Sequence, residues 1–293
     1  MASKKNTLGI QFDGVPWESL KDIPVEREGR YLYVLRPKLN KVSHRVAVDI
    51  QIKNNVKVVT FSSALLVENA TSLPIEVVVV DEKRKHLSSA QKIAPGEDYS
   101  VPIESAYKHR LLVRPDPGFN YNWSTETIFW RDLAAQQHNQ QRYVSDGQSV
   151  NSVSCQPNDD QSQQPFRFQV RGGTDNFDPL AKDYPYMTIR LSAPVEIENL
   201  LPYNMRYTIM EKTSPKHSGP VVTSYLRKGG ISPLHTVDVR NLMLLSVVIE
   251  NTSFHPSEYA IVTSHDPDEL PVENTLTLQD PDGLKLTLGI HRQ

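Results

Sequence analysis

Residues 197–207 have the sequence IENLLPYNMRY, and residues 67–77, which lie 130 positions earlier, have the similar sequence VENATSLPIEV. In each stretch an apolar residue and a glutamate precede an asparagine, Asn199 or Asn69, and a proline and a strand-like run follow. A side-chain amide both donates and accepts hydrogen bonds, so at a corner between strands it can satisfy a backbone N–H and a backbone C=O. The repetition predicts one structural corner asparagine in each of two repeats. The alternative is that both are ordinary turn residues.

Short β-branched runs bounded by turn residues occupy most of the chain, as in KVVTFSSALLVEN (57–69) and PIEVVVVDE (74–82). The best hairpin signal is LTLQDPDGLKLTL at 276–288, where two alternating apolar strands flank a Pro-Asp-Gly turn. One helix is expected, around IFWRDLAAQQ at 128–137. The sequence therefore predicts an all-β protein.

Residues 134–165 interrupt this pattern, because they are rich in Gln, Asn, Ser and Asp and nearly free of aliphatic side chains. The stretches on either side share an order of features, so that residues 93–115 parallel residues 226–249. We predict two tandem β-sandwich-like repeats, 1–133 and 166–293, with a polar flexible insertion or linker between them. The single cysteine, Cys155, lies in that segment and is expected to be incidental rather than a nucleophile.

Composition and motifs exclude several classes of function. The 32 basic residues against 34 acidic ones give a net charge of -2, so no nucleic-acid partner is expected. The start of the chain lacks a signal-peptide pattern, which predicts a cytoplasmic protein. The nine histidines show no metal-ligand spacing, and there is no nucleophile elbow, P-loop or dinucleotide fingerprint. We therefore predict no enzymatic activity, no cofactor and no metal, and interpret HDPDE (265–269) and DPDG (280–283) as strand turns rather than calcium sites.

Several segments together resemble a known family. They are ENLLPYNMRY (198–207), YLRKGGISPLHTVDVRNLMLLSV (225–247), FHPSEYAIV (254–262), LTLQDPDGLKLTL (276–288), and the earlier LGIQFDGVPWESLKDIPVE (8–26) and NVKVVTFSSALLVENATSLPIEVVV (55–79). In this order they resemble the adaptor-binding (VAB) region of the vacuolar-protein-sorting thirteen family. The resemblance covers most of the chain except the polar segment.

The resemblance implies a function. Members of the family are very long, bridge-like lipid-transfer proteins at membrane contact sites. Their VAB region contains several β-rich repeats, each with a characteristic asparagine, which Asn69 and Asn199 match. That region binds a Pro-x-Pro motif in adaptors, which place the protein on organelles. We thus expect a non-enzymatic, monomeric targeting module, a C-terminal pair of repeats without the lipid-conducting rod. It would reach endosomal, vacuolar or mitochondrial membranes indirectly, through adaptors.

The expected peptide site lies in the second repeat, after the corner asparagine and around the glycine turn. Its candidate residues are Tyr203, Met205, Tyr207, Tyr225, Leu226 and His235. Tyrosine and methionine at alternate strand positions also commonly pack a core, and the sequence leaves both interpretations open. Two further hypotheses are a lipid- or membrane-surface-binding β-sandwich, which would use the basic runs EKRKH (82–86) and YKHR (107–110), and a structural spacer.

Overall fold

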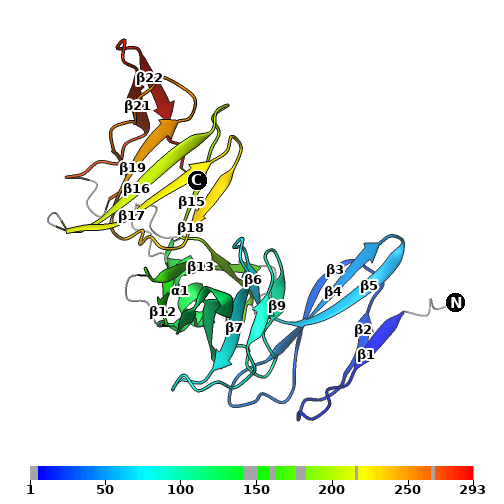
Figure 1. The fold of residues 1–293 in the computed structure, drawn as a ribbon. Helices are drawn as coiled ribbons and strands as arrows, with labels where there is room; N and C mark the ends of the chain where they lie inside the picture. The colour runs from blue at the N-terminus through cyan, green and yellow to red at the C-terminus, as the bar shows by residue number, and fades with distance from the viewer. Residues whose placement is uncertain are drawn as a thin grey trace. The chain divides into compact units, whose positions relative to one another are not determined.

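The computed structural model describes residues 6–140, 151–158, 163–175, 183–214, 217–264 and 268–292. The chain divides into two compact units (Figure 1). The first unit consists of Met1–Asn158 and Gln169–Ser192, and the second of Asp159–Phe168 and Ala193–Gln293. The described residues form 22 β-strands and one short α-helix, so the all-β prediction is confirmed.

The first unit begins with a hairpin and a small sheet. The hairpin consists of β1 (Thr7–Ile10) and β2 (Leu20–Pro24), and the sheet has the order β3 (Gly29–Val34), β4 (Arg45–Lys53), β5 (Val56–Ser63). Ile23 of the hairpin and Val48 and Ile50 of β4 are buried together. These early strands therefore have a small apolar cluster of their own.

Two further sheets complete the first unit. The three-stranded sheet has the order β10 (Arg110–Pro115), β7 (Ile75–Val80), β8 (Gln91–Ile93). The six-stranded sheet has the order β11 (Tyr121–Ser124), β12 (Asn151–Pro157), β13 (Phe166–Asp175), β14 (Tyr186–Ser192), β6 (Leu65–Asn69), β9 (Asp98–Ser100), and a 3-10 turn, η1 (Pro117–Phe119), precedes β11. Strand β14 runs parallel to β6, whereas β9 pairs with the other edge of β6 in the antiparallel direction. Strand β6 is thus an interior strand.

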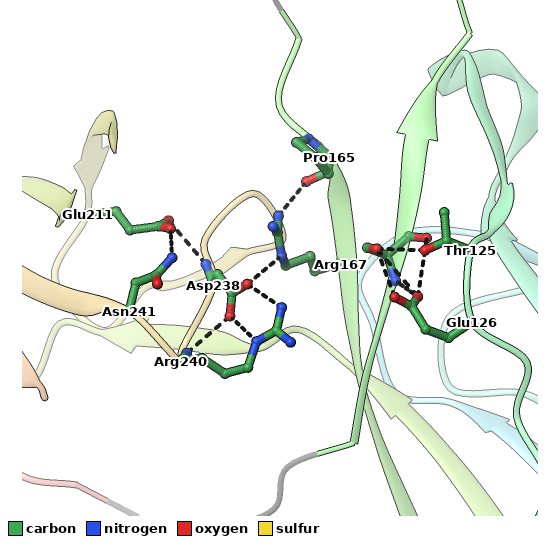
Figure 2. Close-up of polar contacts among 9 residues, drawn as sticks. Thr125, Glu126, Pro165, Arg167, Glu211, Asp238, Arg240 and Asn241 are labelled. Carbon is green, nitrogen blue, oxygen red and sulfur yellow. Dashed lines mark hydrogen bonds and ion pairs between the residues drawn. The ribbon is translucent and has the colours of Figure 1, made fainter. Parts of the chain in front are cut away.

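The polar segment contributes ordered structure where its composition predicted an insertion or linker. Helix α1 (Trp130–Gln140) confirms the expected helix, and β12 lies within residues 134–165. Val153 and Cys155 of β12 are buried, and Ser154 between them donates its backbone N–H to Glu126 (2.8 Å). Figure 2 shows Glu126 with Thr125, whose hydroxyl also donates to the Glu126 carboxylate (2.8 Å). Alternation of buried and hydrogen-bonded positions lets a polar sequence form a strand.

The described residues of the second unit form three sheets. They are the pair β15 (Val195–Glu198) and β18 (Ile231–Leu234), the hairpin β21 (Thr275–Gln279) and β22 (Lys285–Gly289), and a four-stranded sheet with the order β17 (His217–Leu226), β16 (Met205–Ser214), β19 (Leu242–Ile249), β20 (Ala260–Thr263). Strands β21 and β22 pair at Leu276 with Leu288 and at Leu278 with Leu286, which confirms the predicted hairpin. In Figure 1 these strands run from yellow-green to red.

The pairing order of the first repeat recurs in the second. Strand β7 lies between β8 and β10, and β16 lies between β17 and β19 in the same sequence order. Likewise β6 pairs with β9, and β15 pairs with β18. Strands β7 and β16 begin at Ile75 and Met205, which are also 130 residues apart. The sequence offset at the asparagines therefore extends into the central strands.

Candidate functional site

Asn199 lies directly after β15, with 1% of its surface exposed. Its Nδ2 donates to the backbone carbonyls of Tyr203 (2.9 Å) and Leu226 (3.2 Å). Its Oδ1 accepts from the backbone N–H of Leu201 (3.0 Å). The side chain thus joins three backbone groups from the loop after β15 and from the end of β17. Aspartate could not make both donations, and an aliphatic residue could make none of these bonds.

Asn69 makes the equivalent bonds in the first unit and is fully buried. Its Nδ2 donates to the carbonyls of Leu73 (2.8 Å) and Ile93 (3.0 Å), and its Oδ1 accepts from the Thr71 N–H (3.0 Å). The Thr71 hydroxyl adds a fourth bond to Oδ1 (2.7 Å). The acceptors at Leu73 and Tyr203 both lie four residues after the asparagine. The asparagines therefore occupy equivalent structural positions.

A glycine completes each corner. The backbone carbonyls of Asn69 and Asn199 accept from the N–H groups of Gly96 and Gly229, both at 2.8 Å. Gly96 and Gly229 have φ angles of 76° and 67°, in the left-handed region that favours glycine. No atom lies within 4 Å of a Cβ added to either residue, so the backbone conformation, rather than space, requires glycine. The glycine turns found in the sequence are thus parts of the asparagine corners.

The surfaces of the two corners differ. Four large apolar residues of the second corner are exposed, and we call them the corner patch: Leu200 (71%), Tyr203 (54%), Tyr225 (48%) and Ile231 (58%). Each lies at or next to a residue that is hydrogen-bonded to Asn199. The equivalent positions of the first corner hold Ala70, Leu73, Lys92 and Asp98. The two corners therefore share the same hydrogen-bonded frame, but of the two only the second carries four exposed large apolar side chains.

Comparison with known proteins identifies the family of this frame. The family described as "Vacuolar-sorting associated protein 13, adaptor binding domain" matches the chain over residues 1–293. The chain belongs to this family. Its sequence is that of a VPS13 adaptor-binding domain, so the family resemblance of the sequence is confirmed.

Three similar VPS13 proteins illustrate the relationship. The chain is 35% identical over 291 residues to intermembrane lipid transfer protein VPS13 of Chaetomium thermophilum, covering 99% of the chain and 8% of that protein. It is 28% identical over 214 residues to VPS13C of Mus musculus, covering 71% of the chain and 5% of that protein. It is 25% identical over 278 residues to VPS13A of Mus musculus, covering 92% of the chain and 8% of that protein. The chain thus spans less than a tenth of the length of these VPS13 relatives.

The six residues predicted to bind peptide in this VPS13 domain separate into two groups. Tyr203 and Tyr225 are exposed and belong to the corner patch. Met205, Tyr207 and Leu226 are buried in the core of the second unit, at 6%, 1% and 5% exposure. The core-packing alternative therefore describes these three. Leu200 and Ile231 are not among the residues predicted from the sequence, although both lie next to residues of the corner.

His235, the sixth residue, packs against the segment that enters β13. It is 7% exposed, its ring stacks on Phe166 with centroids 4.2 Å apart, and its Nδ1 is 2.9 Å from the Arg167 carbonyl oxygen. Burial lowers the pKa of His235 below its usual value. The structure therefore gives this histidine a packing position that is separate from the corner patch.

A polar cluster follows His235 in the second unit (Figure 2). Asp238 accepts from Arg240 at Nε (2.8 Å) and Nη2 (2.6 Å), and Arg167 Nε lies 3.4 Å away as an ion pair without a hydrogen bond. These bonds from Arg240, and then the Arg167 charge, lower the pKa of Asp238. The buried Glu211 accepts from the Asp238 N–H (3.1 Å) and the Asn241 amide (2.5 Å). The cluster fixes the loop before β19 and is structural.

The basic runs considered for membrane binding are partly engaged within the first unit. Arg84 donates to the carbonyls of Ser124 (2.6 Å) and Thr125. Arg110 lies over the Phe129 ring at 4.7 Å, and Tyr107, in the same run, is buried. Arginines held in this way are less available to a phosphate group than solvated ones, which weakens the membrane-surface hypothesis.

The remaining motifs have structural explanations or lie outside the described residues. Asp280 accepts from the N–H groups of Asp282 (3.0 Å) and Leu284 (2.8 Å), so DPDG forms a strand turn as predicted. Residues 265–267 of HDPDE lie outside the described residues. Among the described residues, no cluster of three or more potential metal ligands occurs. Nor does this part of the chain hold a helix long and apolar enough to cross a membrane.

Proposed function

We propose that the chain binds short Pro-x-Pro segments of adaptor proteins at the corner patch, and so recruits a bridge-like lipid-transfer protein to particular organelle membranes. The observation that carries this proposal is the contrast between the two corners. Both have the same asparagine and glycine frame, but the second exposes Leu200, Tyr203, Tyr225 and Ile231. Membership in a family of adaptor-binding domains supports a protein ligand for this surface.

The chemistry of a Pro-x-Pro segment suits the corner patch. Such a segment is already extended, so it loses little conformational entropy on docking. Its prolines point in the same direction, away from a hydrogen-bonding ladder, and can lie on the faces of Tyr203 and Tyr225. Tyrosine provides a large contact area with only two side-chain torsions to order. Asn199 would act indirectly, since its bonds hold the backbone at Tyr203 and Leu226.

The buried candidates have a supporting part in this proposal. Met205, Tyr207 and Leu226 would keep the strands beneath the patch in place and would not touch the peptide. We further propose that the two units correspond to two adaptor-binding repeats, the first completed by β12 of residues 134–165 and by the β13 and β14 strands that follow it. The module would be a cytoplasmic monomer without enzymatic activity, attached to endosomal, vacuolar or mitochondrial contact sites through its adaptors.

The test is a calorimetric titration of the chain with a Pro-x-Pro peptide and with the same peptide carrying alanine at both proline positions. We expect binding that requires the prolines. Tyr203→Ser and Tyr225→Ser should each weaken it by about tenfold, because aromatic anchors in such patches commonly contribute 1 kcal/mol or more. Tyr259→Ser is the matched control, since Tyr259 is similarly exposed (44%) and lies outside the corner patch.

Two results would overturn the proposal. One is equal affinity for both peptides, and the other is unchanged Pro-x-Pro affinity in a Tyr203→Ser, Tyr225→Ser double variant. Flotation of the chain with anionic liposomes in the absence of an adaptor tests the membrane-surface alternative, and the proposal predicts no flotation. Failure of the folded chain to bind the peptide, together with flotation, would favour that alternative.

A further inference from the structure

Among the described residues, strand β15 pairs with one neighbouring strand, whereas its counterpart β6 pairs with two. In the first unit, β6 pairs with β9 on one side and with the parallel strand β14 on the other. In the second unit, β15 pairs with β18, and the described residues supply no strand on its other side. The same sheet edge is thus occupied by a strand in the first unit and open in the second. The occupied version shows what a ligand of the open edge would look like.

In the described part of the chain, the backbone groups on this edge of β15 face no partner strand. Asn199 donates its N–H to Gly230 in the β18 direction, so by strand alternation Glu196 and Glu198 direct their N–H and C=O groups to the open side. In the first unit, the N–H of Ala70 donates to the carbonyl of Leu191 at the end of β14 (2.8 Å). The equivalent N–H of Leu200 has no acceptor among the described residues. This edge is therefore ready to accept a strand.

Apolar cover is missing at the same place. Leu65 and Val67 of β6 are 2% and 1% exposed, and their register partners on β14 are Met187 and Ile189, both fully buried. The corresponding residues of β15, Val195 and Ile197, are only partly buried. A strand with apolar residues opposite them would remove this surface from water, which is the main favourable contribution to association.

Charge distinguishes the two edges as well. Glu68 of β6 faces Arg190 of β14 in register, with Oε1 and Nη1 3.5 Å apart. Glu198, at the equivalent position of β15, is exposed and has no ion-pair partner in the described part of the chain. Glu196 is also exposed. The open edge therefore presents acidic side chains where the occupied edge has a matched pair.

We infer that the open edge of β15 binds an extended, basic segment of a partner protein as a parallel strand. Its pattern is apolar, any residue, apolar, basic, apolar, with the basic residue opposite Glu198, as in Met187-Thr188-Ile189-Arg190-Leu191 of β14. The apolar positions donate to the ladder, so proline is excluded from them. The edge adjoins the corner patch at Leu200, and its ligand differs from a Pro-x-Pro segment.

The probe is a synthetic peptide with the sequence YMTIRLS, which is that of residues 186–192. Titration into the chain should give saturable binding, and hydrogen exchange at the Glu198 and Leu200 amides should slow. Proline at the position of Ile189 in the peptide should abolish both effects. Failure of the folded chain to bind or to protect these amides would mean that the glutamates serve only to block strand addition, and would overturn the inference.

A charge exchange tests the register. Glu198→Arg should lower the affinity for the YMTIRLS peptide by about fivefold, the upper range for an exposed ion pair. A peptide with Glu in place of its Arg should bind the wild-type chain more weakly but regain affinity for the Glu198→Arg variant. Glu258→Arg is the matched control, since Glu258 is exposed in the same unit and lies outside β15. Equal affinities for all pairs would refute the parallel register.

Two further outcomes would assign the edge to another occupant and overturn the inference. Concentration-dependent dimerisation in sedimentation experiments, reversed by the peptide, would show that a second copy fills the edge. Peptide binding to this chain but not to a longer form of the protein would show that neighbouring sequence fills it in cis. The charge exchange alters Glu198, which is not a corner-patch residue, whereas the Pro-x-Pro test alters Tyr203 and Tyr225. Either proposal can therefore fail while the other is supported.

Discussion

Replacement of Asn199 by alanine should destabilise the second unit and leave the first unchanged. The substitution removes three hydrogen bonds, two to carbonyls and one from a backbone N–H. At about 1 kcal/mol for each bond, the free energy of unfolding of this unit should fall by about 3 kcal/mol. Asn69→Ala removes four hydrogen bonds and should lower the free energy of unfolding of the first unit by about 4 kcal/mol.

The positions of the tryptophans allow the two effects to be measured separately. Trp17, Trp123 and Trp130 all lie in the first unit. Urea denaturation followed by tryptophan fluorescence therefore reports the first unit, whereas far-UV circular dichroism reports both. Asn69→Ala should shift the fluorescence transition. Asn199→Ala should shift only the part of the dichroism transition that fluorescence does not follow.

Two controls define the outcome. Asn122→Ala should change the free energy of unfolding by no more than about 0.5 kcal/mol, because Asn122 is exposed and its one amide bond is long (3.5 Å). Asn199→Asp keeps the size of the side chain but turns a carboxylate oxygen toward two carbonyls, so at neutral pH it should cost at least as much as alanine. A loss below about 1 kcal/mol for Asn199→Ala, or an equal shift of the fluorescence transition, would refute the assignment of a buried corner in each unit.

Three other predictions concern the cysteine, two buried histidines and a closely packed glycine. Burial raises the pKa of the Cys155 thiol to about 12, so a thiol reagent at pH 8 should modify the cysteine only in the denatured chain; rapid labelling of the native chain would contradict this. Burial lowers the pKa of His44 and His235, so the unfolded chain binds more protons as the pH falls from 7 to 5. Urea titrations should then show a falling free energy of unfolding, by at most about 1.4 kcal/mol per pH unit for each histidine, whereas a flat profile would exclude this linkage. Gly172→Ala should lower the free energy of unfolding by about 1–3 kcal/mol, because the added Cβ would lie 2.9 Å from the Cβ of Leu133. Gly173→Ala should be tolerated, since the nearest atom would lie 3.9 Å away. Thermal denaturation compares the two variants, and equal melting temperatures would contradict the packing.

Local sequence signals predicted the features that depend on local chemistry. The 276–288 hairpin, the helix expected at 128–137 and the repeated asparagine each rest on a few adjacent residues with a strong conformational preference. The asparagine corners also required the glycine turns at Gly96 and Gly229, which the sequence showed about 30 residues downstream. These elements were predictable because one type of residue satisfies each requirement.

Features that depend on distant partners were not predictable in the same way. Strand β12 is polar, and it forms because Cys155 packs inside the first unit while Ser154 bonds to Glu126, 28 residues away. The spacing of Tyr203, Met205 and Tyr207 predicted side chains on one face of a strand, but not whether that face is buried or exposed. Only the structure shows that the last two face the core and the first does not. Composition and periodicity describe one strand, whereas burial is a property of the strands packed against it.

The two corners separate the requirements of folding from those of recognition. The interior of each corner is fixed by backbone bonds that asparagine and glycine alone provide well, and these residues recur at equivalent positions. The exterior makes no such bonds, so Lys92 and Asp98 in one unit can correspond to Tyr225 and Ile231 in the other without altering the frame. A repeated frame of this kind can therefore carry different ligand surfaces on the same backbone. It also explains why the repeated residue that identifies the fold is not the residue expected to touch the adaptor.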